Sequence, residues 1–309
     1  MSLLSRRLLY LHFSPNFKLL VTTSTGLSTL STMDLPSLLE RKDFAVELAY
    51  KAGKVILEAS GQMKKVNVKE SFADLVTETD KGVEKMLFEE LKKRFPNDRF
   101  IGEESANKEP WTLEPTWIID PIDGTTNFVH TFPFSCVSIG LTVNKQSSVG
   151  VVYNPSLDRL YTAVKGQGTQ LVEGKKEPVT LRVRDCSSLS EALVMSEFGS
   201  QRDDAKKEAV FRNLEAIGWK CHGVRSLGTA AINLCSVASG HADAYYEFGL
   251  HIWDMAAAAL ILTEAGGYVC DTKGGPLDMQ SRRILAASSE KLANEISETL
   301  LIHLEMERD

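Results

Sequence analysis

The sequence predicts a layered α/β protein in which an antiparallel meander sheet precedes a mostly parallel sheet. Between residues 135 and 171, short apolar alternations are separated by turn clusters such as Asn144-Lys145 and Lys165-Gly166, which is typical of an antiparallel meander. After about residue 185, strand-like and helix-like segments alternate, which is typical of a mostly parallel sheet with helices on its faces. The chain has 309 residues, of which 43% are hydrophobic, so it can bury a core between fused layers.

The first 33 residues differ from the rest because they contain Arg6, Arg7 and Lys18 but no Asp or Glu. An Arg-containing, Ser-rich and acid-free N-terminus resembles an organelle transit peptide, so mitochondrial targeting is one interpretation. The alternative, which we favour, is an untargeted disordered extension or a start codon read upstream of Met33. We therefore predict an extension over residues 1–33 and a single domain over 34–309, with an antiparallel-sheet half (34–184) and a βα half (185–309).

Two helices are expected at the start of the domain. The first is predicted to begin near Pro36, where Ser37 and Glu40 have the spacing of a capping box, and to end at Gly61. Its buried face is marked by apolar residues at helical spacing, namely Ala45, Leu48, Ala52, Val55, Ile56 and Ala59. The other elements expected before the meander are a helix over 79–94 and strands over 99–102 and 116–119.

The βα half is expected to alternate strands and helices without a linker or an internal repeat. The strands are predicted over 192–195, 220–222, 242–246, 268–270 and 284–287, and the helices over 203–217, 229–238, 254–265 and 290–303. Because no low-complexity segment separates the two halves, we expect them to form one unit.

Composition excludes several classes of protein. The net charge of −6 argues against electrostatic binding of nucleic acid, and no apolar run is long enough to span a membrane. The five cysteines are scattered and form no CxxC pair, which indicates buried free thiols in a reducing compartment. We expect a cytoplasmic protein whose partner is a small molecule, not a membrane or a nucleic acid.

Two groups of carboxylates follow predicted buried strands. Glu103 and Glu104 come after the strand over 99–102, and Asp120 and Asp123 come after the strand over 116–119, with the Ile122 carbonyl between them. Mg²⁺ prefers hard oxygen ligands, and unpaired carboxylates beside a buried strand are costly without a cation. The pattern therefore predicts a carboxylate cage for two divalent ions, completed by a phosphate oxygen.

The residues after this turn, 124–127, form a predicted helix N-terminus of small residues. Exposed backbone N–H groups at such a terminus bind phosphate without a basic side chain. An acidic protein with a metal cage beside an anion-binding turn has the parts that a phosphatase needs.

These segments resemble the signatures of the inositol monophosphatase family. Residues 117–130 (WIIDPIDGTTNFVH) closely resemble the first signature, and residues 253–267 (WDMAAAALILTEAGG) resemble the second. Further segments that are similar to the family, in the family's order, lie at 74–80, 101–105, 228–231 and 244–247. The resemblance runs from about residue 40 to the C-terminus, and it implies an alternating αβαβα sandwich that forms a homodimer.

The resemblance implies a set of metal ligands. Glu103, Asp120 and the Ile122 carbonyl would hold a first Mg²⁺, and Asp120, Asp123 and Asp254 would hold a second. A third, more weakly bound ion would be coordinated by Glu103, so that each site takes two to three ions. Lithium would inhibit by occupying the second position after catalysis.

The resemblance also implies catalytic and substrate-binding roles. Gly124 and Thr125 would cradle the phosphate, and a water oriented by Glu103 and Thr125 would attack phosphorus, with Asp80 paired to the Thr125 hydroxyl. The residues implied in substrate binding also include Asp123, Gly228, Thr229, Ala230, Glu247 and Asp254. The implied reaction is the hydrolysis of inositol monophosphate to inositol and phosphate.

Alternatives remain open for both the residues and the function. Asp254 could merely cap its helix, and Asp80 could merely be a first-turn carboxylate favoured by the helix dipole. The substrate could instead be a nucleotide 3′-phosphate or a sugar bisphosphate. An inactive metal-binding scaffold is the alternative of another class, although the intact carboxylates argue against it.

Overall fold

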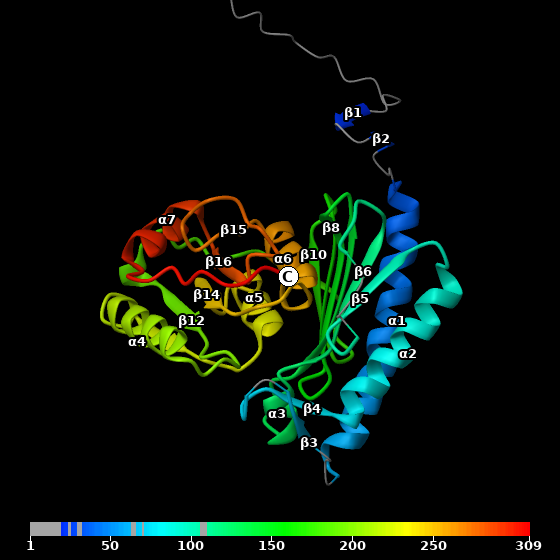
Figure 1. Ribbon diagram of the computed structural model, residues 1–309, viewed down its shortest axis with the longest axis horizontal. Helices are drawn as coiled ribbons and strands as arrows, with labels where there is room; N and C mark the ends of the chain where they lie inside the picture. Colours follow the sequence, from blue (N-terminus) through cyan, green and yellow to red (C-terminus); the bar gives the residue numbers. More distant parts are fainter. Residues whose placement is uncertain (1–19, 24–25, 30–32, 63–65, 70, 106–109) are drawn as a thin grey trace, which may run out of the picture.

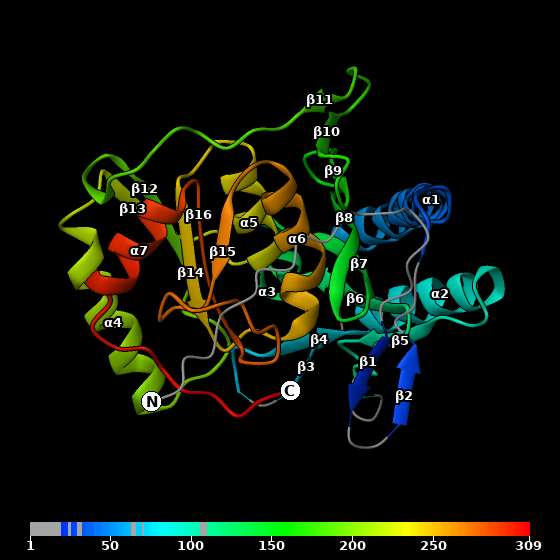
Figure 2. The ribbon, with the colours of Figure 1, turned by 90° about the horizontal axis from the view of Figure 1, so that it is seen from above.

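The computed structural model describes residues 20–23, 26–29, 33–62, 66–69, 71–105 and 110–309. In this part of the chain, helices and sheets stack in five layers, in the order helix, sheet, helix, sheet, helix (Figures 1 and 2). The predicted layered α/β class is confirmed. The expected disorder or targeting role of residues 1–33 falls mostly outside the described residues, which include there only the strand pair β1 (Leu20–Thr23) and β2 (Gly26–Thr29) and the residue Met33.

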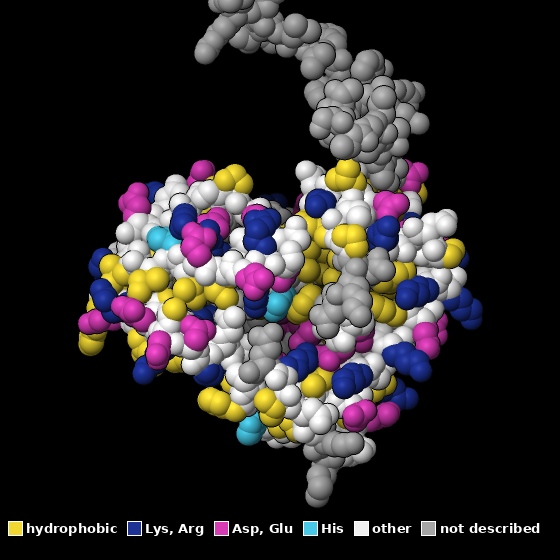
Figure 3. Space-filling model, viewed as in Figure 1, with side chains coloured by type: hydrophobic (Ala, Val, Ile, Leu, Met, Phe, Trp, Pro, Cys, Tyr) yellow, Lys and Arg dark blue, Asp and Glu magenta, His cyan; other side chains and the backbone are white. Residues whose placement is uncertain are grey.

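The surface carries charges of both signs. On the face shown in Figure 3, Lys and Arg side chains are interspersed with Asp and Glu side chains, so this face has no single-sign patch of the kind that attracts nucleic acid. Among the described residues, no helix is both long enough and apolar enough to cross a membrane.

The first outer layer consists of α1 (Leu35–Ser60) and α2 (Glu78–Arg94). The predicted capping box of Ser37 and Glu40 is wrong. Asp34 is the N-cap, its side chain accepts a hydrogen bond from the Ser37 N–H at 3.0 Å, and Ser37 lies inside the first turn. The end of the helix at Gly61 is as predicted.

A seven-stranded sheet forms the second layer, in the spatial order β11-β10-β9-β8-β7-β6-β5. Its strands are β5 (Arg99–Gly102), β6 (Thr116–Asp123), β7 (Cys136–Val143), β8 (Gln146–Asn154), β9 (Arg159–Val164), β10 (Thr169–Glu173) and β11 (Val179–Thr180). The strands β7 to β10 form the predicted antiparallel meander, and β5 pairs with β6 in parallel. The strand β6 is longer than predicted and includes Asp120 and Asp123, with an irregular register between them.

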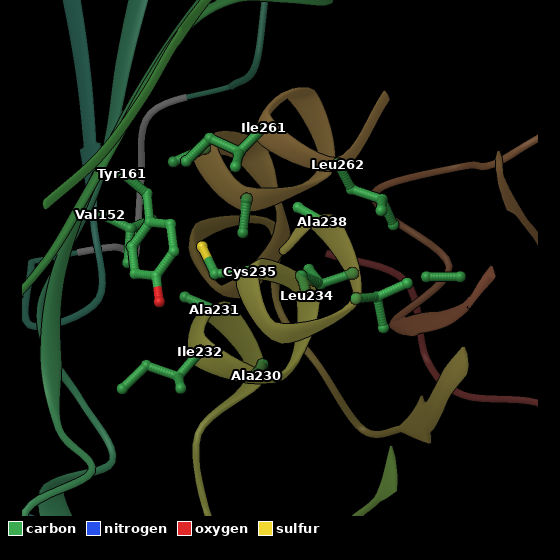
Figure 4. Close-up of a cluster of buried hydrophobic side chains, with 14 of the residues drawn as sticks. Val152, Tyr161, Ala230, Ala231, Ile232, Leu234, Cys235, Ala238, Ile261 and Leu262 are labelled. Carbon is green, nitrogen blue, oxygen red and sulfur yellow. The ribbon is translucent and has the colours of Figure 1, made fainter. Parts of the chain in front are cut away.

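The middle layer consists of α5 (Ala230–Ala238) and α6 (Ile252–Glu264). Figure 4 shows Val152 and Tyr161 on the side of the seven-stranded sheet, facing these two helices across a buried apolar cluster. Small residues allow a close approach, because a Cβ built on Gly140 of β7 would lie 3.0 Å from Ala256 Cβ of α6. This close contact fixes α6, and the site residue at its start, against the sheet that holds Asp120 and Asp123.

The second sheet is mixed, which corrects the prediction of a mostly parallel sheet. Its order is β13-β12-β14-β16-β15, with parallel pairing of β12 to β13 and β14 and antiparallel pairing of β16 to β14 and β15. The strands are β12 (Leu193–Ser196), β13 (Gly223–Arg225), β14 (Ala244–Phe248), β15 (Tyr268–Cys270) and β16 (Arg283–Ala287). No helix lies between β15 and β16, and a parallel pair needs a crossover, which is usually a helix.

The last layer consists of α4 (Asp204–Gly218) and α7 (Glu290–Thr299). The largest differences from the boundaries predicted in the βα half are that the strand expected over 220–222 lies at β13 and that the helix expected to reach residue 303 ends at Thr299. The short elements that remain are β3 (Val66–Val68), β4 (Leu75–Thr77), α3 (Thr125–Val129) and the 3-10 turn Leu189–Glu191.

Candidate active site

A cavity of about 630 Å³ lies between the two halves of the domain and is lined by residues from both. The predicted site residues on its wall are Glu103, Asp120, Ile122, Asp123, Gly124, Thr125, Gly228, Thr229, Ala230, Glu247 and Asp254. Asp80 does not line the cavity but contacts Thr125 from behind. The structure therefore brings the predicted residues together around one cavity.

The irregular end of β6 orients Asp120 and Asp123. Asp120 Oδ1 accepts a hydrogen bond from the Ile122 N–H at 3.0 Å, so this carboxylate stabilises the bend that follows it. Asp123 Oδ2 accepts hydrogen bonds from the Thr229 hydroxyl at 2.6 Å and from the Ala231 N–H at 2.7 Å. Asp123 thus connects the first half to the N-terminus of α5.

Asp254 enters the site from the first turn of α6. Its Oδ2 accepts a hydrogen bond from the His251 N–H at 2.6 Å, so Asp254 caps this helix as well as facing the cavity. Carboxylate oxygens of Asp120, Asp123 and Asp254 lie within 4.8 Å of one another.

The electrostatics of these three aspartates fit a divalent cation. Burial raises the pKa of all three, and neighbouring carboxylates raise the pKa of Asp120 and Asp254 further. Two buried acids and one partly buried acid that share a site without a cation cannot all ionise at low cost. An oxygen-only set of ligands is the type that Mg²⁺ prefers, so the residues present fit the metal that the sequence predicts.

Glu103 lies beside this group and pairs with a lysine. Lys69 Nζ lies 2.8 Å from Glu103 Oε1 and 2.7 Å from Glu104 Oε1. Burial raises the pKa of Glu103 to about 7, although the Lys69 charge acts in the opposite direction. Burial alone would lower the pKa of Lys69, but the two glutamates outweigh it and raise that pKa.

The Thr125 hydroxyl lies between two acceptors. Its Oγ1 is 3.1 Å from Asp80 Oδ1 and 3.0 Å from the Ile122 carbonyl. Asp80 Oδ2 accepts a hydrogen bond from the Thr77 N–H at 2.9 Å, which completes a capping box at the start of α2. Both interpretations of Asp80 therefore agree with the geometry, because one carboxylate caps the helix and contacts Thr125.

The opposite wall of the cavity is fixed by buried polar groups. Glu197 Oε1 accepts hydrogen bonds from the Leu227 N–H at 2.6 Å and the Gly228 N–H at 2.9 Å, which anchors the segment before α5. Glu247 is 6% exposed and accepts a hydrogen bond from the Tyr245 hydroxyl. Thr229 and Ala230 lie on this wall, although the Thr229 hydroxyl is already bonded to Asp123.

Sequence reasoning missed Lys69, Glu197 and Lys206, which lie in or behind the wall of the cavity. Only Lys206 left a signal in the sequence. It lies on the buried stripe of α4, three and four residues before Ala209 and Val210, where an apolar residue is expected. Lys69 and Glu197 each directly follow a short strand, and nothing in their spacing indicates which way their side chains point.

The sequence model of the inositol monophosphatase family matches residues 38–305. The chain belongs to the inositol monophosphatase family. It is 49% identical over 274 residues to inositol monophosphatase 1 of Rattus norvegicus, with 87% of this chain and 97% of that relative covered. It is also 49% identical over 260 residues to inositol monophosphatase 2 of Homo sapiens, with 83% of this chain and 88% of that relative covered.

Solved structures are also similar in fold. The extragenic suppressor protein suhB of Bartonella henselae matches with a TM-score of 0.77 and 32% identity, covering 86% of this chain and 100% of that chain. The inositol monophosphatase from Anabaena matches with a TM-score of 0.73 and 31% identity, covering 87% of this chain and 98% of that chain. The expected family is therefore confirmed by sequence and by fold.

Proposed function

We propose that this chain hydrolyses inositol monophosphate to inositol and phosphate with the help of two to three Mg²⁺ ions. Membership in the inositol monophosphatase family makes it a phosphatase, and relatives that share nearly half of the aligned residues carry the name of this substrate. The observation that most supports the proposal is the cluster of Asp120, Asp123 and Asp254 beside the Thr125 hydroxyl.

The ligand assignment is part of this proposal. One ion would be held by Asp120, Asp123 and Asp254. A second would be held by Glu103, Asp120 and the Ile122 carbonyl, and a third would be coordinated by Glu103. Mg²⁺ in such a site neutralises the charge of the phosphate, lowers the pKa of water and stabilises the leaving oxygen. Lithium is expected to inhibit by competing for the position beside Asp254.

The side chains around the ions would position the attacking water. If the Thr125 hydroxyl donates to Asp80 at 3.1 Å, its lone pairs are free to accept a hydrogen bond from that water. Glu103 would be the second acceptor, since it lines the same cavity. The water would then attack phosphorus directly, without a phosphoenzyme, while Gly124 and Thr125 hold the phosphate oxygens.

The wall on the far side would recognise the polyol. Asp123, Glu247 and the segment Gly228–Ala230 line the cavity and would face the inositol hydroxyls. Glu247 would accept hydrogen bonds from hydroxyl groups and would not bind metal. We further propose a cytoplasmic homodimer that supplies inositol for lipid signalling, as the resemblance to the family implies.

A phosphate-release assay tests this function. Inositol 1-phosphate, a 3′-phosphonucleotide and fructose bisphosphate are compared as substrates, with Mg²⁺ and with EDTA. We expect the highest kcat/KM with inositol 1-phosphate, loss of turnover in EDTA and inhibition by lithium. Asp120→Asn should lose turnover, whereas Asp43→Asn, which changes an exposed acid on α1, should not.

Each contrary result identifies an alternative. Preference for either of the other substrates would assign the chain to a related phosphatase. Full turnover in EDTA would contradict the role of the metal, and no turnover on any of the three would leave an inactive scaffold.

A further inference from the structure

A lysine is buried behind the substrate wall of the cavity. Lys206 is 2% exposed and belongs to the first turn of α4, where its own N–H donates to the N-cap Asp203 at 2.9 Å. A buried ammonium group is costly, and the N-terminus of a helix disfavours positive charge. An uncharged side chain would avoid both costs at this position, so a positive charge here needs a negatively charged group or a hydrogen-bond acceptor nearby.

The ammonium group of Lys206 lies close to Glu247. A Cβ built on Gly199 would lie 3.0 Å from Lys206 Nζ and 3.4 Å from Glu247 Oε1, so both atoms flank the same point of the backbone. Lys206 Nζ also donates a hydrogen bond to the Phe248 carbonyl, on the residue after Glu247. The lysine therefore contacts the end of β14 that presents Glu247 to the cavity.

The backbone around this lysine leaves little room for another position of its side chain. A Cβ built on Gly249 would lie 3.2 Å from Lys206 Nζ and 2.9 Å from Gln201 Oε1, a buried oxygen that has no hydrogen-bond partner. Lys206 itself is not on the cavity wall, whereas Glu247, Gly199 and Gly249 are. Any effect of Lys206 on the substrate must therefore pass through the groups in front of it.

The charges around Glu247 are of both signs. The negative groups Glu197, Asp123 and Asp254 and the Tyr245 hydroxyl act on Glu247, while Lys206 has Asp203, Arg202 and Arg282 around it. Burial raises the pKa of Glu247 to about 8, and Lys206 is the positive charge that opposes this shift. Without that charge, Glu247 would hold its proton to a higher pH and would accept hydrogen bonds less well.

We propose that Lys206 is a positioning residue that favours the carboxylate form of Glu247 beside the substrate hydroxyls, and so strengthens a preference for polyol phosphates over simple phosphate esters. The inference rests on the proposed function, in which Glu247 contacts the polyol. It assigns a specificity role to a side chain that touches neither substrate nor metal.

A double-mutant cycle tests the proposal. The measured quantity is the KM for inositol 1-phosphate divided by the KM for phenyl phosphate, whose leaving group has no further hydroxyl. We expect Glu247→Gln to raise this ratio about 10- to 100-fold. Lys206→Met should raise it about 5- to 10-fold, because a rise of about one unit in the pKa of Glu247 lowers the ionised fraction of that side chain about tenfold at a pH below its pKa. Lys206→Met should add nothing in the Glu247→Gln background, since the lysine acts through the glutamate.

The pH profile provides a readout that a purely structural lysine would not change. In the wild type the KM ratio should fall as pH rises from 7 to 9 and Glu247 loses its proton. In Lys206→Met this fall should move to higher pH, and in Glu247→Gln it should disappear. Lys207→Met, which removes an exposed lysine from the same helix, should match the wild type throughout.

Three results would overturn the proposal. An unchanged ratio in Lys206→Met, or additive effects in the double variant, would leave Lys206 a packing residue. If Lys206→Met does not fold, Lys206→Gln is measured instead. This variant is also uncharged and can still donate to the Phe248 carbonyl, and it must show the same change in the KM ratio. Absence of wild-type turnover of inositol 1-phosphate would contradict the proposed function first and this inference with it.

Discussion

The Thr125 hydroxyl can donate only one hydrogen bond but lies near two acceptors, Asp80 and the Ile122 carbonyl. If the carbonyl turns toward a cation, as the proposed ligand set requires, Asp80 becomes the acceptor that remains. The hydroxyl oxygen then faces the cavity with its lone pairs free. The orientation of one hydroxyl thus depends on a buried carboxylate that also caps α2.

Asp80→Asn tests this dependence at the scale of single residues. Asparagine at this third helical position can still accept the capping-box hydrogen bond from the Thr77 N–H, so the melting temperature should stay within a few degrees of the wild type. The amide is a weaker acceptor for Thr125, so kcat should fall by about 10²-fold, the lower end of what positioned acid–base groups contribute. Steady-state kinetics beside a melting curve measures both quantities.

Glu78→Gln is the matched control, because Glu78 lies in the same first turn of α2 but is exposed. It should leave kcat unchanged. If Asp80→Asn also keeps the wild-type kcat, Asp80 is a cap and nothing more.

Site residues that belong to a sequence motif could be predicted, whereas site residues outside a motif could not. Asp120 and Asp123 lie close together at the end of a buried strand, so their chemistry could be inferred from neighbours in the sequence. Lys69 and Glu197 reach the cavity from loops, and their partners lie about 30 or more residues away. No local pattern encodes such contacts.

At the scale of elements, the turn from β6 into α3 depends on Gly124. This residue has a φ of 85°, and a Cβ added to it would lie 2.9 Å from the Phe134 carbonyl oxygen. Left-handed backbone costs a residue with a Cβ about 1–2 kcal/mol, and the close carbonyl adds a steric clash. The turn that presents Thr125 to the cavity therefore requires glycine.

Gly124→Ala should damage activity more than stability. About 1 kcal/mol of strain lowers the melting temperature of a domain of 150–250 residues by about 2–4 °C, so a drop of several degrees is expected here. A displaced Thr125 should lower kcat/KM by about 10²-fold, as misplacement of catalytic groups by about 1 Å does.

Gly166→Ala separates backbone strain from the clash. Gly166 also has a positive φ, of 75°, but nothing lies within 4 Å of a Cβ added to it. It should lose a little stability and keep full activity. Equal kinetic losses in both variants would contradict a specific role for the Gly124 turn.

The elements that sequence patterns predicted well are those whose signal is local. The helix end at Gly61 and the meander turns follow from glycine and turn residues along the chain. The N-cap of α1 was misassigned because Asp34 and Ser37 both suit that position, and only the structure shows which side chain accepts the bond. The direction of β16 depends on how the chain crosses the sheet, which no periodicity records.

At the scale of the whole molecule, Met33 is the first residue whose side-chain packing the structure describes. Met33 contacts the apolar cluster under α1, and Asp34 caps that helix. A chain that starts at Met33 should therefore keep the wild-type kcat and melting temperature. A chain that starts at Leu38 is the control and should melt lower, because loss of an N-cap costs about 1 kcal/mol.

A fall of several degrees for the chain that starts at Met33 would show that the preceding residues pack against the domain. A fall in kcat without a change in melting temperature would place them at the active site. Either result would contradict the proposal that residues 1–33 are an extension outside the domain.

The meeting of the two halves at one cavity could not have been predicted from spacing alone. Asp123 ends β6 and Asp254 begins α6, and between them lie most of both sheets. Resemblance to the family predicted that they share a metal, and the structure places their oxygens within 4.8 Å of each other. A cation there would connect the halves, so metal binding and the stability of the whole domain should be coupled.

Asp254→Asn tests this coupling. Asparagine can still accept the hydrogen bond from the His251 N–H, so the start of α6 should remain capped. Removing one of three crowded carboxylates relieves their repulsion, so the metal-free variant should melt at or above the temperature of the metal-free wild type. The increase in melting temperature on adding Mg²⁺ should shrink or vanish, because the site has lost a charged ligand.

The kinetic consequence separates the two roles of Asp254. Loss of a residue that only supports metal ligands already costs about 10–100-fold in affinity or activity, so loss of a ligand should lower kcat at ordinary Mg²⁺ by at least that factor. Asp34→Asn is the control, since it alters a helix cap that lies outside the cavity wall and should preserve both kcat and the Mg²⁺-dependent increase in melting temperature. If Asp254→Asn behaves like Asp34→Asn, the aspartate is a cap, and the two halves are connected by packing alone.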